Sequence, residues 1–201
     1  MKLVASPTSP FARKVHVMLL EKNLPFEWHE SIPWNADSDV PRYNPLGKVP
    51  ALVADDGKIW TDSPVIAEYL ETLNVAPRLV PEDPLGAVDV RQIEALADGV
   101  CEAAIQIFLK KKREVELQSA AWIARQEGKL DAGLAALADA VKENEWVYGE
   151  SFSLADIAIV CFLEWFSFRF AAHSWKVTYP ALAAYVARVA MRESFQKTQP
   201  R

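Results

Sequence analysis

The chain has 201 residues, of which 51% are hydrophobic and 24% are charged, a balance typical of a globular protein with a substantial core. Its formal net charge of −5 argues against a general affinity for nucleic acid or for an anionic membrane surface. The most apolar run, at 154–163, is too short to span a bilayer and contains Asp156, and no signal peptide is recognisable. We therefore expect a cytoplasmic protein.

The first part of the chain predicts a β-α-β unit. The apolar segment 2–5 is expected to form a strand, residues 10–23 carry helical periodicity, and 26–30 alternate as a second strand does. Segments 50–55 and 58–61 flank an Asp-Gly pair, which is a strong hairpin signal.

A further helix is predicted over 63–73, with Ser63 as its N-cap and Pro64 at its first helical position. This order of elements indicates an α/β domain with a four-stranded mixed sheet.

The remainder of the chain predicts an all-helical bundle. Three prolines in the segment 76–86 indicate a linker between a domain at 1–75 and a domain at 87–201. Helical periodicity then occupies four segments: 87–116, 119–143, 153–170 and 179–195.

The helix expected from residue 153 starts with a recognisable cap. Ser153 is the expected N-cap, and Asp156 follows three residues later in a variant of the capping box. We therefore expect both residues to be structural.

Two cysteines, Cys101 and Cys161, lie sixty positions apart in apolar segments, without the spacing of a zinc site. We expect both to be buried and expect the protein to bind no metal.

Three short segments carry the chemistry that the sequence offers. Ser9-Pro10 is the start of a helix, and Ser9 taken alone is better explained as a helix cap than as a functional residue. A proline at a strand start, Pro50, cannot donate to the ladder, and a cis Val49–Pro50 bond would expose the Val49 backbone to an extended peptide ligand. Asp62 and Ser63 open another helix, where a hydroxyl suits a carboxylate and an acid suits an ammonium group.

These segments together resemble the glutathione transferase family. The resemblance rests on four motifs in the family's order and spans essentially the whole chain: "SPFARK", "YNPLGKVP", "TDSPVIAEYL" and "SLADIAI". It implies a thioredoxin-like N-terminal domain, a helical C-terminal domain, glutathione as co-substrate and a homodimer. Asp62 stands where many members of the family carry Glu, which shortens the reach of this side chain by one methylene.

The resemblance also implies roles for single residues. Ser9 would contact the glutathione sulfur, Val49 would bind the cysteinyl backbone, and Pro50 would be cis. Asp62 with Ser63 would hold the γ-glutamyl end, and Asn35 and Lys48 are candidates for the glycyl end. The second substrate would be a small hydrophobic electrophile or a peroxide. The sequence leaves its wall open: Gln106 and Phe108 are candidates, and so are Trp165 and Phe166, although an aromatic stripe such as theirs is more typical of a buried helix face.

Two functions remain open from the sequence. An enzyme would use the Ser9 hydroxyl to stabilise the glutathione thiolate, whereas a regulatory protein with the same fold would bind glutathione without turnover. A disulfide reductase is disfavoured, because serine at position 9 cannot form the mixed disulfide that cysteine forms.

Overall fold

The computed structural model describes residues 1–142 and 144–200 and consists of two compact units. Unit 1 contains Met1–Pro81 and the described residues from Arg192 onward, and unit 2 spans Glu82–Met191. The elements of unit 1 are β1 (Lys2–Ala5), α1 (Pro10–Glu21), β2 (Glu27–Glu30), the 3-10 helix η1 (Val40–Arg42), β3 (Ala51–Val53), β4 (Ile59–Thr61), α2 (Ser63–Thr72) and α8 (Glu193–Gln196).

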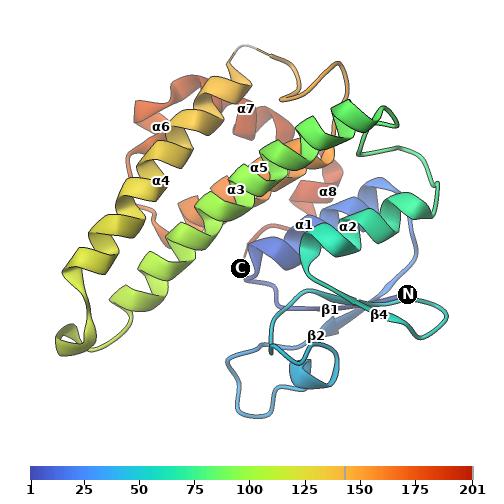
Figure 1. Cartoon of the computed structure of the whole chain (residues 1–201), viewed down its shortest axis with the longest axis horizontal. Coiled ribbons are helices and arrows are strands. Elements are labelled where there is room, and N and C mark those ends of the chain that lie inside the picture. The colour runs from blue at the N-terminus through green and yellow to red at the C-terminus, as the bar shows by residue number, and fades with distance from the viewer. Residues whose placement is uncertain (143, 201) are drawn as a thin grey trace. The chain divides into compact units, whose positions relative to one another are not determined.

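The sheet of unit 1 has the strand order β2-β1-β3-β4. β2 pairs parallel with β1, while β3 pairs antiparallel with both β1 and β4, so the predicted four-stranded mixed sheet is confirmed. Helices α1 and α2 lie side by side over one face of the sheet (Figure 1), where they bury the apolar side chains of β1 and β3. The segment between β2 and β3 extends away from these helices.

The hairpin between β3 and β4 turns where the sequence predicts. Gly57 has φ +84, a conformation that side chains with a Cβ rarely adopt, and its N–H donates to Ala54. The Asp56 carboxylate accepts from the N–H of Lys58 at 2.9 Å. The pair Asp56-Gly57 therefore fixes the register of the two strands.

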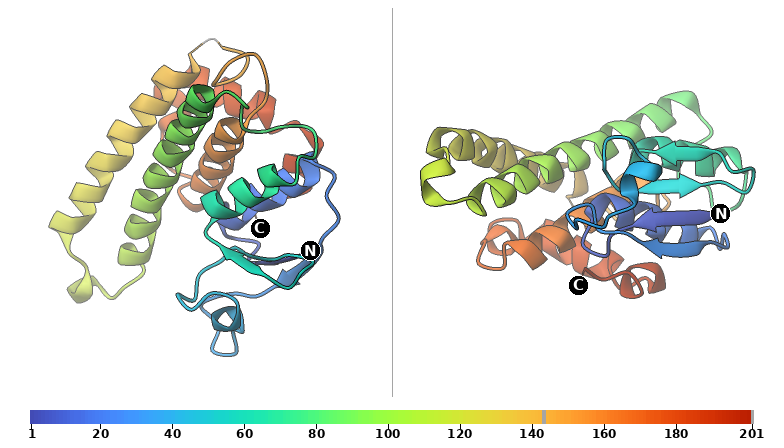
Figure 2. Two further views of the ribbon diagram at one scale, coloured as in Figure 1. Left: turned by 45° about the vertical axis from the view of Figure 1, so that its right-hand side comes forward. Right: turned by 90° about the horizontal axis from the view of Figure 1, so that it is seen from below.

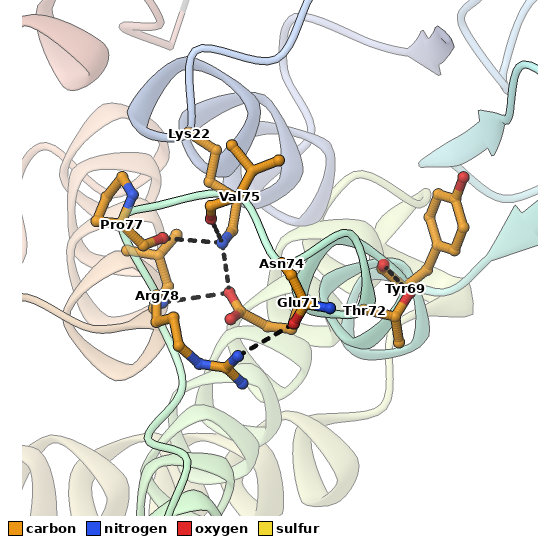
Figure 3. A network of polar contacts seen from close by, with 9 residues as sticks. Lys22, Tyr69, Glu71, Thr72, Asn74, Val75, Pro77 and Arg78 are labelled. Atoms are coloured by element: carbon orange, nitrogen blue, oxygen red, sulfur yellow. Dashed lines mark hydrogen bonds and ion pairs between the residues drawn. The ribbon is translucent and has the colours of Figure 1, made fainter.

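A buried lysine at the end of α1 holds the segment that follows α2. Lys22 Nζ pairs with Glu71 Oε1 at 3.0 Å and donates to the carbonyls of Val75 and Pro77 at 2.9 and 2.8 Å (Figure 3). Glu71 Oε1 also accepts from the N–H of Leu79 at 3.2 Å. These bonds compensate the cost of burying the ion pair, and they fix residues 75–79 against α1 and α2.

Unit 2 is helical. Its elements are α3 (Pro84–Lys111), the 3-10 helix η2 (Val115–Leu117), α4 (Ala120–Val141), α5 (Leu154–Arg169), α6 (Trp175–Thr178) and α7 (Pro180–Val189). Helix α3 packs against α4 and α5, and α7 packs against α4, α5 and α6. Most side chains of α5 are buried, and so are Cys101 and Cys161, as expected.

Helices α3 and α4 run alongside each other (Figure 2) and approach closely at a glycine. A Cβ built on Gly133 would lie 2.1 Å from Val100 Cγ2, a distance that real atoms do not adopt. The absence of a side chain at Gly133 therefore allows α4 to lie against Val100.

Several element limits differ from the sequence prediction. Residues 84–86, expected in the linker, form the first turn of α3, because Asp83 caps that turn by accepting from Gly86 N at 2.7 Å. This helix ends at Lys111 rather than at 116, and η2 follows. Most of 119–143 forms α4, although Glu143 lies outside the described residues.

The single helix expected at 179–195 is two helices, α7 and α8, separated at residues 190–192. Arg192 at this break has an extended backbone, which ends the helical course. Residues 192–200, expected in the helical domain, pack with unit 1.

The start of α5 carries the capping box. Ser153 is the N-cap, and the Asp156 carboxylate accepts from the Ser153 N–H at 2.6 Å and from its hydroxyl at 2.8 Å. Asp156 is fully buried and also accepts from the Val147 N–H at 2.9 Å and from the Tyr185 hydroxyl. Both residues therefore serve the structure of unit 2.

Candidate functional site

The sheet register gathers the candidate segments at one end of the sheet of unit 1. Val4 near the end of β1 pairs with Ala51 at the start of β3, and Ala51 pairs with Thr61 at the end of β4. The segments that follow β1, precede β3 and follow β4 therefore leave the sheet at the same end. β2 is parallel to β1, so the loop that follows it leaves there too.

Ser9, which follows β1, is the N-cap of α1. Its backbone is extended, with φ −88 and ψ 119, and its Oγ accepts from the N–H of Ala12 at 3.2 Å. Accepting this bond occupies a lone pair and leaves the hydroxyl proton for another partner. The half-buried Ser9 hydroxyl is thus a cap that also retains the capacity to donate.

The loop before β3 is held by Asn44. This buried side chain accepts from the Leu46 N–H and donates to the Lys48 carbonyl, each at 3.0 Å. Gly47, with φ +62, completes the turn by donating to the Asn44 carbonyl at 2.8 Å. Asn44 is not among the residues predicted from the sequence, although an Asn directly before a Pro is a typical turn former.

The Val49–Pro50 bond that follows this turn is cis. Val49 lies two residues before Ala51, the first residue of β3, and its backbone forms no hydrogen bond to another residue in the described ranges. The Val49 N–H and C=O are therefore unused by the sheet.

The start of α2 differs by one residue from the prediction. Asp62, not Ser63, is the N-cap, and Ser63 is the first helical residue. Pro64 does not distinguish the two assignments, because proline is compatible with either of the first two helical positions. Asp62 has φ 73 and ψ 129, an unusual conformation for a residue with a side chain, and its exposed carboxylate does not cap the helix. Such local strain is concentrated at functional sites.

Ser63 is buried, and within the described ranges its Oγ has no hydrogen-bond partner. A buried hydroxyl without a partner is costly and calls for an explanation. The first N–H groups of a helix also lack partners within the helix. The start of α2 thus offers several unsatisfied donors to an anion.

The remaining candidates for glutathione contacts, Asn35 and Lys48, are both exposed. Asn35 belongs to the loop after β2, which is held at its far end by Asp39. The Asp39 carboxylate accepts from Ser31 Oγ at 2.6 Å and lies 2.9 Å from His29 Nε2. The Ser31 hydrogen bond, followed by that of His29, holds the pKa of Asp39 below its usual value.

The four candidates for the electrophile wall belong to unit 2 and differ in burial. Trp165 and Phe166 are buried, which assigns them to the core of that unit. Phe108 is half-buried and meets the rings of Trp165 and Phe170 edge-on, and Gln106 is exposed. Of these four side chains, only those of Phe108 and Gln106 are accessible at the surface.

The described residues show neither a metal-binding cluster nor a membrane-spanning helix. They contain no group of three or more His, Cys, Asp or Glu side chains arranged to hold a metal ion. None of the helices formed by residues 1–142 and 144–200 has the length and apolar character needed to cross a membrane.

Two solved structures are similar to this chain over nearly their whole length. A glutathione S-transferase of Methylobacillus flagellatus with GSH bound has a TM-score of 0.96 and 38% identity, covering 100% of this chain and 99% of that one. A glutathione S-transferase of Methylobacterium radiotolerans in complex with glutathione sulfonate has a TM-score of 0.95 and 38% identity, covering 99% and 94%.

Sequence comparisons agree. The family models for the N-terminal and C-terminal domains of glutathione S-transferase match residues 8–73 and 120–188. The chain is 44% identical to the GST-like protein YibF of Escherichia coli, covering 100% of this chain and 98% of that protein. It is 32% identical to maleylacetoacetate isomerase of Pseudomonas aeruginosa, covering 80% and 78%. The chain therefore belongs to the glutathione S-transferase family.

Proposed function

We propose that this protein is a glutathione transferase in which the Ser9 hydroxyl stabilises the thiolate of bound glutathione. The observation that carries the proposal is the Ser9 hydrogen bond: Oγ accepts from Ala12 N and keeps its proton for the sulfur. GSH bound in the Methylobacillus flagellatus relative supports the choice of thiol, and glutathione sulfonate bound in the Methylobacterium radiotolerans relative supports a site for the glutathione scaffold.

The unsatisfied groups of unit 1 match the parts of glutathione. The γ-glutamyl carboxylate would accept from Ser63 Oγ and from the N–H groups at the start of α2, and the Asp62 carboxylate would pair with the ammonium group. The unused Val49 backbone would bond the cysteinyl residue. The exposed Asn35 and Lys48 would reach the glycyl carboxylate.

A hydrogen bond and a helix N-terminus can lower the pKa of the glutathione thiol enough without a general base. A thiol with a pKa of about 8.5 is mostly protonated at neutral pH, and lowering this pKa by about two units requires roughly 2.7 kcal/mol. A hydrogen bond to a charged acceptor contributes about 1.5–3 kcal/mol, and a helix N-terminus about 0.3–1 kcal/mol. Ser9 and the start of α1 together supply that amount.

The thiolate would attack a small hydrophobic electrophile or reduce a peroxide. Serine at position 9 supports these reactions over thiol-disulfide exchange by the protein itself. Membership of the family further supports a cytoplasmic homodimer that needs no metal.

A panel assay tests the proposal. Wild-type protein is supplied with glutathione and either an aryl halide, an organic hydroperoxide or a mixed disulfide of glutathione, and glutathione binding is measured by calorimetry. We expect turnover of the halide or the hydroperoxide. Micromolar glutathione binding without turnover of any of the three would instead support a binding protein, and turnover of the disulfide alone would contradict the role of Ser9.

Ser63→Ala separates binding from stability. Because the substitution removes a buried hydroxyl that has no partner among the residues the structure describes, we expect the ligand-free protein to keep or slightly raise its melting temperature. We expect the Kd for glutathione to rise about tenfold or more, the effect of losing about 1.5 kcal/mol from a charge-assisted hydrogen bond.

The matched control for this measurement is Ser119→Ala. Ser119 caps α4 in unit 2 by accepting from Trp122 N at 3.3 Å. Its loss is expected to lower stability by about 1 kcal/mol and leave glutathione affinity unchanged. Equal glutathione affinity in wild type and Ser63→Ala would exclude Ser63 from the site.

A further inference from the structure

The side chain of Arg13 joins the first turns of α1 to the C-terminal segment of the chain. This buried guanidinium donates from Nε to Thr198 Oγ1 and from Nη2 to the Phe195 carbonyl, both at 3.2 Å. It also lies over the buried Phe195 ring at 5.5 Å. Thr198 Oγ1 in turn donates to the Ser194 carbonyl at 2.8 Å, which holds the acceptor in place.

The same C-terminal segment is anchored separately at the other end of α1. The Glu21 carboxylate accepts from Arg192 Nε and Nη2 at 2.9 and 2.7 Å, and from Ser194 Oγ at 2.6 Å. Partial burial acts against ionisation of Glu21, but the bonds from Arg192 and Ser194 hold its pKa below the usual value. Helix α8 thus packs against α1 (Figure 1), and hydrogen bonds hold the C-terminal segment near both ends of α1.

Arg13 lies one helical turn from Ser9. The Arg13 N–H donates to the Ser9 carbonyl at 3.0 Å and closes the first turn of α1, and within that turn Ala12 N donates to Ser9 Oγ. A displacement of the Arg13 backbone therefore carries both the carbonyl and the hydroxyl of Ser9 with it.

We propose that Arg13, held by residues 195–198, is a positioning residue that fixes the Ser9 hydroxyl relative to the glutathione sulfur. This inference rests on the proposed function of Ser9. A planar guanidinium with directed hydrogen bonds restricts both rotation and sliding of the helix turn, which an apolar contact alone does not do. Catalytic groups need such support, because a displacement of about 1 Å costs up to about 100-fold in rate.

The test compares Arg13→Met with Arg13→Lys and Thr198→Val. The methionine variant keeps the apolar stem and loses both hydrogen bonds, the lysine variant keeps the charge without the planar fork, and Thr198→Val removes one acceptor at similar volume. The readouts are the pKa of bound glutathione, from thiolate absorbance, and the kcat and Kd values. All are measured at a temperature where circular dichroism shows folded protein.

We expect the pKa of bound glutathione to rise in all three variants, most in Arg13→Met, where kcat falls roughly tenfold at neutral pH while Kd changes much less. Thr198→Val should shift the pKa in the same direction by a smaller amount. It also keeps the test decisive if Arg13→Met does not fold.

Arg192→Ala is the matched control, since it loosens the same segment at the distant end of α1. It should lower the melting temperature and leave the pKa of bound glutathione unchanged. If the Arg13 variants and Arg192→Ala lower stability alike and none shifts this pKa, Arg13 is structural only and the inference is wrong. If Ser9→Ala itself leaves the pKa unchanged, the proposed function fails and the inference fails with it.

Discussion

Ser9→Ala is expected to lower kcat/KM for glutathione conjugation roughly 10- to 20-fold at neutral pH, and more at lower pH. The hydroxyl supplies about 2 of the roughly 2.7 kcal/mol that lower the thiol pKa by about two units, so its loss raises this pKa by about 1.5 units and lowers the thiolate fraction at neutral pH by about that factor. The alanine variant retains the helix N-terminus but has no proton to donate to the sulfur. The measurement is the pH dependence of kcat/KM with an electrophile that wild type turns over.

The pKa of the glutathione thiol determines how the rate deficit of Ser9→Ala changes with pH. With the hydroxyl present, bound glutathione is largely thiolate at neutral pH, so the rate is already near its plateau. Without the hydroxyl, the thiol pKa returns toward about 8.5, and the rate should rise roughly tenfold per pH unit until that value is reached. The deficit of the variant is therefore largest at low pH and shrinks as the pH rises.

Loss of the cap accompanies this change, because Ser9 Oγ also accepts from Ala12 N. The melting temperature should fall by the equivalent of about 1 kcal/mol. Ser119→Ala suffers a comparable loss without touching the site, so it separates the two effects. Equal rates for wild type and Ser9→Ala across the pH range would exclude Ser9 as the donor to sulfur.

Ser9→Cys is expected to gain an activity, whereas Ser9→Ala loses one. It places a thiol at the start of α1, where a thiolate is favoured, and should gain exchange activity on a mixed disulfide of glutathione. This gain would support the view that residue 9 selects the type of reaction.

The sequence predicts the elements of unit 1 well because local signals coincide there. Ser9-Pro10 marks a helix start and Asp56-Gly57 a hairpin, and both occur as predicted. At α2 the local signals compete, because Asp62 and Ser63 are both good caps and Pro64 fits either frame. Only the fold shows that Asp62 is the cap, and that Ser63 is left buried without a partner in the described chain.

Contacts between residues far apart in the chain could not be predicted from local sequence patterns. The periodicity of 179–195 predicts one helix, since nothing local reveals that residues near 195 contact Arg13, more than 180 positions earlier. The role of Asn44 was missed for a related reason, because its two hydrogen bonds depend on how the loop closes. The assignment of the candidate site residues depended on four motifs in order, none of which is specific alone.

Asp156→Ala is expected to lower the free energy of unfolding by on the order of 4 kcal/mol. The buried carboxylate accepts four hydrogen bonds, from Val147 N, from Ser153 N and Oγ, and from the Tyr185 hydroxyl. Alanine leaves all four donors buried without an acceptor, at about 1–3 kcal/mol for each that water does not reach. At about 2–4 °C per kcal/mol for a chain of this size, the melting temperature should fall by roughly 8–16 °C.

Tyr185→Phe is the graded comparison. Burial and the neighbouring Asp156 raise the pKa of Tyr185, so its hydroxyl keeps its proton and donates throughout the working pH range. Removing this one donor should cost about 1 kcal/mol, far less than removing the shared acceptor. The double variant should therefore be less destabilised than the sum of the two, because Tyr185→Phe removes a donor that Asp156→Ala leaves unsatisfied. Additive losses, or a fall of only a degree or two for Asp156→Ala, would show that the carboxylate does not organise these donors.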